Sequence, residues 1–168
     1  MDLGTAIRAA RTSALKRWLL DRVLHWRVPF NRPHDLRLHP LPDGAITVRI
    51  PYWRVNRNHI RGVHACCMAT AAEYCCGIAL LEHVDAKRYR LIMKRLQVEY
   101  HYQAKAAVVA RFHLTDERLQ QEILLPLEGQ ESVLFVAQVE LHDEPGNHIA
   151  TAHITWQVKD WRKVRTKA

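Results

Sequence analysis

The sequence predicts an α+β domain in which one long buried helix is wrapped by an antiparallel sheet. Residues 64–83 are apolar on nearly every side, which is typical of a helix at the centre of a protein rather than on its surface. Runs of alternating or β-branched residues follow it, at 91–102, 106–115, 132–141 and 148–158. A single helix followed by sequential strands favours an α+β architecture.

The segments before the central helix contain one more helix and one or two strands. Residues 5–25 have apolar side chains at spacings of three and four, with Arg and Lys between them. We expect this amphipathic helix to pack on its own domain rather than on a membrane. Strand-like sequence starts at Leu36 and continues over residues 45–53, and the polar residues 54–63 form a loop.

The length and composition indicate one domain. A chain of 168 residues with 48% apolar residues is long enough to bury its own core. We expect an N-terminal helix at 1–30, a single domain at 31–160 and a basic tail at 161–168. No run of about 18 uncharged apolar residues and no secretory signal is recognised, so no membrane contact is expected.

The net charge of +8 favours an anionic partner. A nucleic acid, an acidic membrane surface and a phosphorylated small molecule such as coenzyme A all fit that charge. The basic residues are dispersed and accompany no recognised nucleic-acid motif, so nucleic-acid binding is not expected.

Four cysteines form two adjacent pairs inside the central helix, Cys66-Cys67 and Cys75-Cys76. Neighbouring residues on a helix point about 100° apart, so neither pair suits a tetrahedral metal site, and no metal is expected. We interpret the cysteines as reduced, buried apolar residues, which indicates a cytoplasmic location.

The only charged residue in the middle of the central helix is Glu73. A buried carboxylate is unfavourable unless it is paired, and burial raises its pKa toward the range of a general base or nucleophile. A structural role, with Glu73 satisfied by Arg57, Arg61 or a backbone donor at an interface, is an equal alternative.

His64 stands at the start of the central helix, where unpaired backbone N–H groups are suited to bind an oxyanion. Asn58, in the preceding loop, adds an amide that can orient a carbonyl group or water. A capping or packing role is the alternative for His64. Nine residues separate His64 from Glu73, so they lie about 13 Å apart and on opposite sides of the helix. Only two chains related by a two-fold axis would bring them together.

These residues resemble the motif of hotdog-fold acyl-CoA thioesterases of the phenylacetyl-CoA thioesterase type. Asn58, Gly62, His64 and Glu73 match the motif, while Ala65-Cys66 stands where the family has Gly-Gly. The resemblance extends over about 31–158 and is greatest to an uncharacterised bacterial group with an extra N-terminal helix. It implies a hotdog fold and a homodimer, and it leaves open whether dimers pair into a tetramer.

The resemblance also implies roles for these residues. The N–H groups of Ala65 and Cys66 would polarise the thioester carbonyl, and Asn58 and His64 would orient that carbonyl or the attacking water. Glu73 of the other subunit would act as general base or as nucleophile. The candidates for substrate binding are Gly62, Cys66, Arg57, Arg61, Lys94 and Lys105. The four basic residues would bind the phosphates of coenzyme A, and each of them also fits a solvated surface role.

The predicted function is hydrolysis of an acyl-CoA or acyl-carrier thioester, with coenzyme A as part of the substrate and no separate cofactor. Two other hypotheses stay open. One is a non-catalytic hotdog protein that binds acyl-CoA or lipid. The other is an enoyl-thioester hydratase, for which the spacing between His64 and Glu73 is less suitable.

Overall fold

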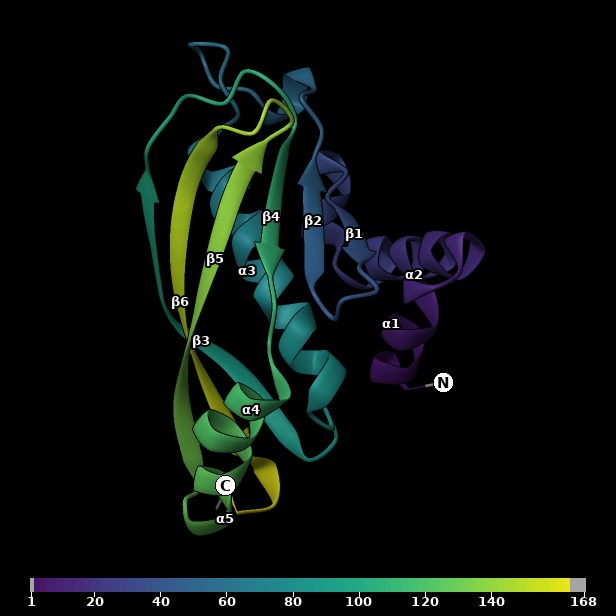
Figure 1. The fold of residues 1–168 in the computed structure, drawn as a ribbon, viewed down its shortest axis with the longest axis vertical. Helices are drawn as coiled ribbons and strands as arrows, with labels where there is room; N and C mark the ends of the chain where they lie inside the picture. The colour runs from purple at the N-terminus through teal and green to yellow at the C-terminus, as the bar shows by residue number, and fades with distance from the viewer. Residues whose placement is uncertain (1, 164–168) are drawn as a thin grey trace.

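The computed structural model describes residues 2–163 and has one helix lying along a six-stranded antiparallel sheet (Figure 1). The strand order is β1-β2-β4-β5-β6-β3. The strands are β1 (Arg37–Pro40), β2 (Ile46–Ile50), β3 (Tyr89–Tyr100), β4 (Val108–Phe112), β5 (Ser132–Asp143) and β6 (His148–Asp160). The predicted α+β architecture is confirmed.

The long helix α3 (Ala65–His83) is central, as its apolar sequence predicted. It packs against the inward-facing side chains of the sheet, among them Phe135, Leu141 and Ile154, which are fully buried. By length and composition alone α3 is apolar enough to cross a membrane, but 67% of its apolar window is buried within the domain. Its hydrophobicity is therefore explained by its place in the core.

The two edges of the sheet differ in length. The β1 edge is four residues long, and α1 (Leu3–Arg11) and α2 (Ala14–Arg27) lie beyond it (Figure 1). The β3 edge is twelve residues long and pairs only with β6 among the described strands. One side of β3 therefore presents unpaired backbone N–H and C=O groups.

The prediction of one N-terminal helix over 5–25 is wrong. The segment forms two helices because Ser13 caps the second one, with its hydroxyl accepting a hydrogen bond from the Lys16 N–H at 3.4 Å. The predicted packing face is also wrong for α2. Leu20 and Leu24 pack on the core, while most of the apolar side chains of α2 are exposed.

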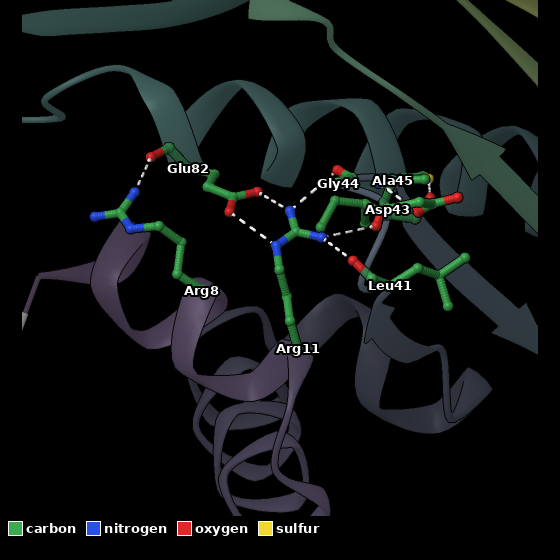
Figure 2. A network of polar contacts seen from close by, with 9 residues as sticks. Arg8, Arg11, Leu41, Asp43, Gly44, Ala45 and Glu82 are labelled. Atoms are coloured by element: carbon green, nitrogen blue, oxygen red, sulfur yellow. Dashed lines mark hydrogen bonds and ion pairs between the residues drawn. The ribbon is translucent and has the colours of Figure 1, made fainter.

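Two arginines of α1 hold it against the end of α3 (Figure 2). Arg11 donates to both carboxylate oxygens of Glu82, at 3.2 Å from Nε and 2.5 Å from Nη2. The same guanidinium group donates to the carbonyl oxygens of Leu41, Gly44 and Ala45 in the β1–β2 turn. Arg8 adds a bond to the Glu82 carbonyl oxygen at 3.3 Å. Three distant segments are thereby joined.

A helical segment between β4 and β5 has no counterpart in the sequence prediction. It consists of α4 (Asp116–Leu119), the π-helical turn η3 (Gln120–Leu124) and α5 (Leu125–Gly129). Shorter 3-10 turns are η1 (Pro29–His34), η2 (Arg54–Asn56) and η4 (Trp161–Lys163). Of the predicted tail 161–168, residues 164–168 lie outside the described residues.

The cysteines are free thiols, and three of the four are buried as predicted. Burial raises the pKa of Cys67 and of Cys76 to about 12 and raises that of Cys75 as well, so these thiols stay protonated. The prediction is wrong for Cys66, which is exposed because it lies in the first turn of α3, beyond the cover of the sheet.

Candidate active site

The loop that precedes α3 is fixed by a fully buried asparagine, Asn56. Its amide nitrogen donates to the carbonyl oxygens of Pro51 at 2.9 Å and His34 at 3.0 Å, and its side-chain oxygen meets His34 Nδ1 at 2.9 Å. Its own carbonyl oxygen accepts from the backbone N–H of His64 at 2.7 Å. Asn56 therefore sets the position at which α3 begins.

Asn58 shapes the next turn of this loop. Its Oδ1 accepts from the N–H groups of Ile60 at 3.1 Å and Gly62 at 2.9 Å. Within residues 2–163 no acceptor is bonded to its Nδ2, so the amide N–H₂ group is free to donate to a ligand. A Cβ atom at Gly62 would come within 3.0 Å of Gln103 Cγ, so the close approach of these two loops favours glycine.

His64 is the N-cap of α3. Its Nδ1 accepts from the N–H of Cys66 at 3.1 Å, which places the proton of the neutral imidazole on Nε2. The N–H groups of Cys67 and Met68 bond to the His64 carbonyl oxygen. Among the described residues, the N–H of Ala65 has no acceptor. Of the two donors proposed for the oxyanion, Ala65 is therefore free and Cys66 is engaged.

Tyr100 ties the end of β3 to the first turn of α3. Its hydroxyl donates to the carbonyl oxygen of Ala65 at 2.9 Å. A second loop contact joins the Val63 N–H to the Ala104 carbonyl oxygen at 2.9 Å. Sequence reasoning did not single out Tyr100 or Asn56 as site residues. No local pattern marks them, since their partners are distant backbone groups.

Glu73 lies on the part of α3 that the sheet does not cover. This open stripe contains Cys66, Ala69, Thr70 and Glu73, all exposed or half-buried. Partial burial raises the pKa of Glu73, and no hydrogen bond or ion pair to its carboxylate exists among residues 2–163. Arg57 stacks on the ring of Tyr52 at 5.1 Å instead of pairing with Glu73.

The surroundings of Glu73 explain this desolvation. At Gly77, one turn further along α3, an added Cβ atom would lie 3.2 Å from Trp156 Cζ2 and 3.8 Å from Glu73 Oε1. Gly77 thus lets the indole of Trp156 pack against the helix beside the carboxylate. The indole N–H is bonded to Cys76 Sγ at 3.2 Å and does not serve Glu73.

The structure does not bring His64 and Glu73 together in one chain. They lie at the start and the middle of one helix, separated by the roughly 13 Å expected from their spacing. Arg57, Arg61 and Lys105 lie on the two loops at the His64 end of the molecule. Lys94 lies at the bulge of β3, about 20 Å along the strand from Tyr100.

Comparison with known proteins places this geometry in a family. Residues 16–158 match the family model described as "Domain of unknown function (DUF4442)". None of the curated protein sequences matches the chain.

Several solved structures have the same fold. A protein of unknown function from Pseudomonas aeruginosa, named as a probable thioesterase, is 25% identical, with a TM-score of 0.76 over 84% of this chain and 94% of that one. A thioesterase family protein from Silicibacter pomeroyi is 18% identical, with a TM-score of 0.64 over 83% and 96% of the two chains. A protein of unknown function from Chlorobaculum tepidum is 11% identical, with a TM-score of 0.72 over 90% and 99%. The likeness to the last two shows the fold alone.

The chain belongs to the DUF4442 family, and its fold is that of the hotdog thioesterase superfamily.

Proposed function

We propose that this protein hydrolyses the thioester bond of an acyl-CoA or acyl-carrier substrate, at sites formed between the two subunits of a homodimer. The observation that carries the proposal is the free N–H of Ala65 at the start of α3. This donor is reinforced by the positive end of the helix dipole, and it suits the negative charge that develops on a thioester carbonyl oxygen during attack.

His64 and Asn58 provide the neighbouring donors. Because Nδ1 of His64 accepts the capping bond, Nε2 carries a proton and faces the ligand as a donor rather than as a base. The free N–H₂ group of Asn58 donates as well. Both side chains therefore orient the carbonyl group, and the general base is assigned to another residue.

That base is Glu73 of the partner subunit. Its unpaired carboxylate, with a pKa raised by burial, accepts a proton from water while the water oxygen attacks the thioester carbon. The carbon–sulfur bond then breaks, and the leaving thiolate takes the proton from Glu73. The products are a carboxylic acid and a free thiol, and these steps use no cofactor beyond the coenzyme A in the substrate. In the alternative role, the Glu73 carboxylate attacks the thioester carbon and displaces the thiolate, which forms a transient anhydride; water then hydrolyses the anhydride, and hydroxylamine would trap it.

The open side of the domain supports the dimer. The open stripe of α3 and the unpaired edge of β3 lie on the same side, since Tyr100 of β3 bonds to the first turn of α3, and β3 exposes Met93 and Tyr100 there. A two-fold axis that set the two α3 helices antiparallel would cover this apolar surface and bring the partner's Glu73 toward His64. Assembly into a tetramer and a cytoplasmic location stay predictions.

The similarity to solved structures named as thioesterases supports the reaction class. Arg57, Arg61 and Lys105, at the His64 end of the molecule, provide positive charge for the phosphates of coenzyme A. Lys94, at the bulge of β3 and about 20 Å along the strand from Tyr100, would reach that region only from the partner subunit.

The test is hydrolysis of a panel of acyl-CoAs by the wild type and by Glu73→Gln. Thioester absorbance is the preferred readout, because a thiol reagent would also label the exposed Cys66. Loss of a general base lowers kcat by roughly 10²- to 10⁴-fold. Glu140→Gln, at an exposed position on β5, is the matched control and keeps full activity. Equal rates for the wild type and Glu73→Gln on every substrate would refute the assignment.

The same panel separates the two remaining hypotheses. Saturable binding of acyl-CoA without turnover would identify a non-catalytic carrier. Hydration of an enoyl-CoA, with the thioester left intact, would identify a hydratase.

A further inference from the structure

Helix α2 presents an exposed apolar stripe that nothing in residues 2–163 covers. Its members recur at helical spacing and thus lie on one side of the helix: Leu15, Trp18, Leu19, Val23 and Trp26, followed by Phe30 in η1. Leu15 is 68% exposed and Trp26 is 77% exposed. Isolated exposed apolar residues are common on proteins, but a continuous row with two tryptophans indicates an interaction surface.

Basic side chains accompany this stripe: Lys16 and Arg27 flank it and Arg22 lies within it, whereas Arg17 faces the domain and contacts His39. Lys16, Arg17, Arg22 and Arg27 belong to α2, whose single acidic residue is Asp21. Asp21 is engaged within the fold, since its Oδ1 accepts from the Leu38 N–H at 3.0 Å. The guanidinium groups of Arg22 and Arg27 lie over the rings of Trp18 and Trp26, at 5.9 and 5.8 Å. Positive charge and aromatic surface are therefore presented together.

A cleft of about 640 Å³ runs along the flank of α2. Trp18 and Trp26 line it together with five arginines, among them Arg22 and Arg32. The carboxylates of Asp21 and Asp35 also line it, and both are bonded within the fold. None of Asn58, His64 and Glu73 lines this cleft, so it is separate from the candidate active site. Its size and its guanidinium groups suit a phosphate-bearing head group next to the aromatic rings.

The chemistry of this surface selects one class of partner. Tryptophan concentrates at the boundary between lipid head groups and acyl chains, and basic residues there are attracted to anionic lipids. A second copy of the chain docked by the same face would bring two sets of three basic residues, Lys16, Arg22 and Arg27, together, which is unfavourable.

We propose that α2 docks this protein on anionic phospholipid bilayers. Leu15, Trp18, Leu19, Val23, Trp26 and Phe30 enter the boundary between head groups and acyl chains, while the flanking basic residues contact lipid phosphates. This inference does not depend on the proposed hydrolase activity. It replaces the expectation from the sequence that the apolar side of this helix packs on its own domain.

The test is sedimentation of the full chain with phosphatidylcholine vesicles, with and without about 30 mol% phosphatidylglycerol. We expect binding to the anionic vesicles, weaker binding to the neutral ones, and a decrease as ionic strength rises. Equal binding to both vesicle types, or no binding to either, would overturn the proposal.

Matched pairs of variants locate the contact. Leu15→Asp lies in the first turn of α2, where an acidic residue is compatible with the helix, and it should weaken partitioning about tenfold. Its control is Leu134→Asp, at a leucine on β5 that is 63% exposed, which should bind like the wild type. Lys16→Glu should lose at least about fivefold in partitioning, while Lys87→Glu, at an exposed lysine elsewhere, should lose much less. Circular dichroism checks that each variant is folded.

Two other results would overturn the proposal. If Leu15→Asp dissociates an oligomer and leaves vesicle binding unchanged, the stripe is an interface between copies of the chain. If the protein binds random DNA more tightly than anionic vesicles, and Lys16→Glu but not Leu15→Asp removes that binding, the surface recognises polyanions by charge alone.

Discussion

The contact between Arg11 and Glu82 predicts a large loss of stability when Arg11 is replaced. The side chains of Arg11 and Glu82 are only 12% and 3% exposed, and Arg11 also serves three carbonyl oxygens of the β1–β2 turn (Figure 2). Arg11→Met would leave the Glu82 carboxylate buried without its partner. Breaking a buried ion pair in this way costs about 3–5 kcal/mol.

The assay is equilibrium unfolding in urea at one fixed protein concentration, because dimerisation would make the midpoint depend on concentration. With a slope of about 2 kcal/mol per molar urea, the midpoint should fall by about 1.5–2.5 M. The control is Arg49→Met, which removes an exposed pair with Glu144 and should lower stability by less than about 1 kcal/mol.

The double variant Arg11→Met/Glu82→Met removes the unpaired carboxylate. It should therefore be destabilised less than the sum of the two single variants, by roughly 1–3 kcal/mol. The reasoning would be refuted if the double variant lost as much stability as the two single variants together. It would also be refuted if the urea midpoint of Arg11→Met equalled that of Arg49→Met.

Two further predictions concern the candidate site. Burial raises the pKa of Glu73 above its ordinary value of 4.5, so ionisation opposes folding as pH rises through the raised pKa. In thermal unfolding, Glu73→Gln should thus be more stable than the wild type at pH 8, and this gain in stability should vanish below about pH 4.5. A gain in stability that is independent of pH would contradict the prediction. Asn56→Ala removes the amide that holds Pro51 and His34, and it should lower kcat together with thermal stability. Asn147→Ala, which removes an amide bonded to Asp143 in the β5–β6 turn, should leave kcat unchanged.

Most of the fold could be predicted because its strongest signals are local. The apolar run of 64–83 predicted α3, and alternating residues predicted the long strands β3, β5 and β6. The segment 116–129 was missed although Leu119, Ile123 and Leu127 recur at every fourth position. Its π-helical turn and Pro126 interrupt the regular helical pattern that such an analysis seeks.

The candidate site was only partly predictable. Asn58, His64 and Glu73 were identified from residue type and position. Helical geometry alone predicted that His64 and Glu73 lie too far apart to act on one substrate within one chain. The roles of Asn56 and Tyr100 depend on tertiary bonds to distant backbone atoms, which the sequence does not mark. The exposure of the α2 stripe was not predictable either, because an amphipathic pattern does not tell which surface covers it.

The central claim is that each active site combines His64 of one subunit with Glu73 of the other. The most direct test is complementation between Glu73→Gln and His64→Ala, each of which should be nearly inactive alone. Mixed dimers with one copy of each, purified through two different affinity tags, contain one intact site of two and should regain about half of the wild-type activity. Mixed dimers as inactive as the two parents would contradict the shared site.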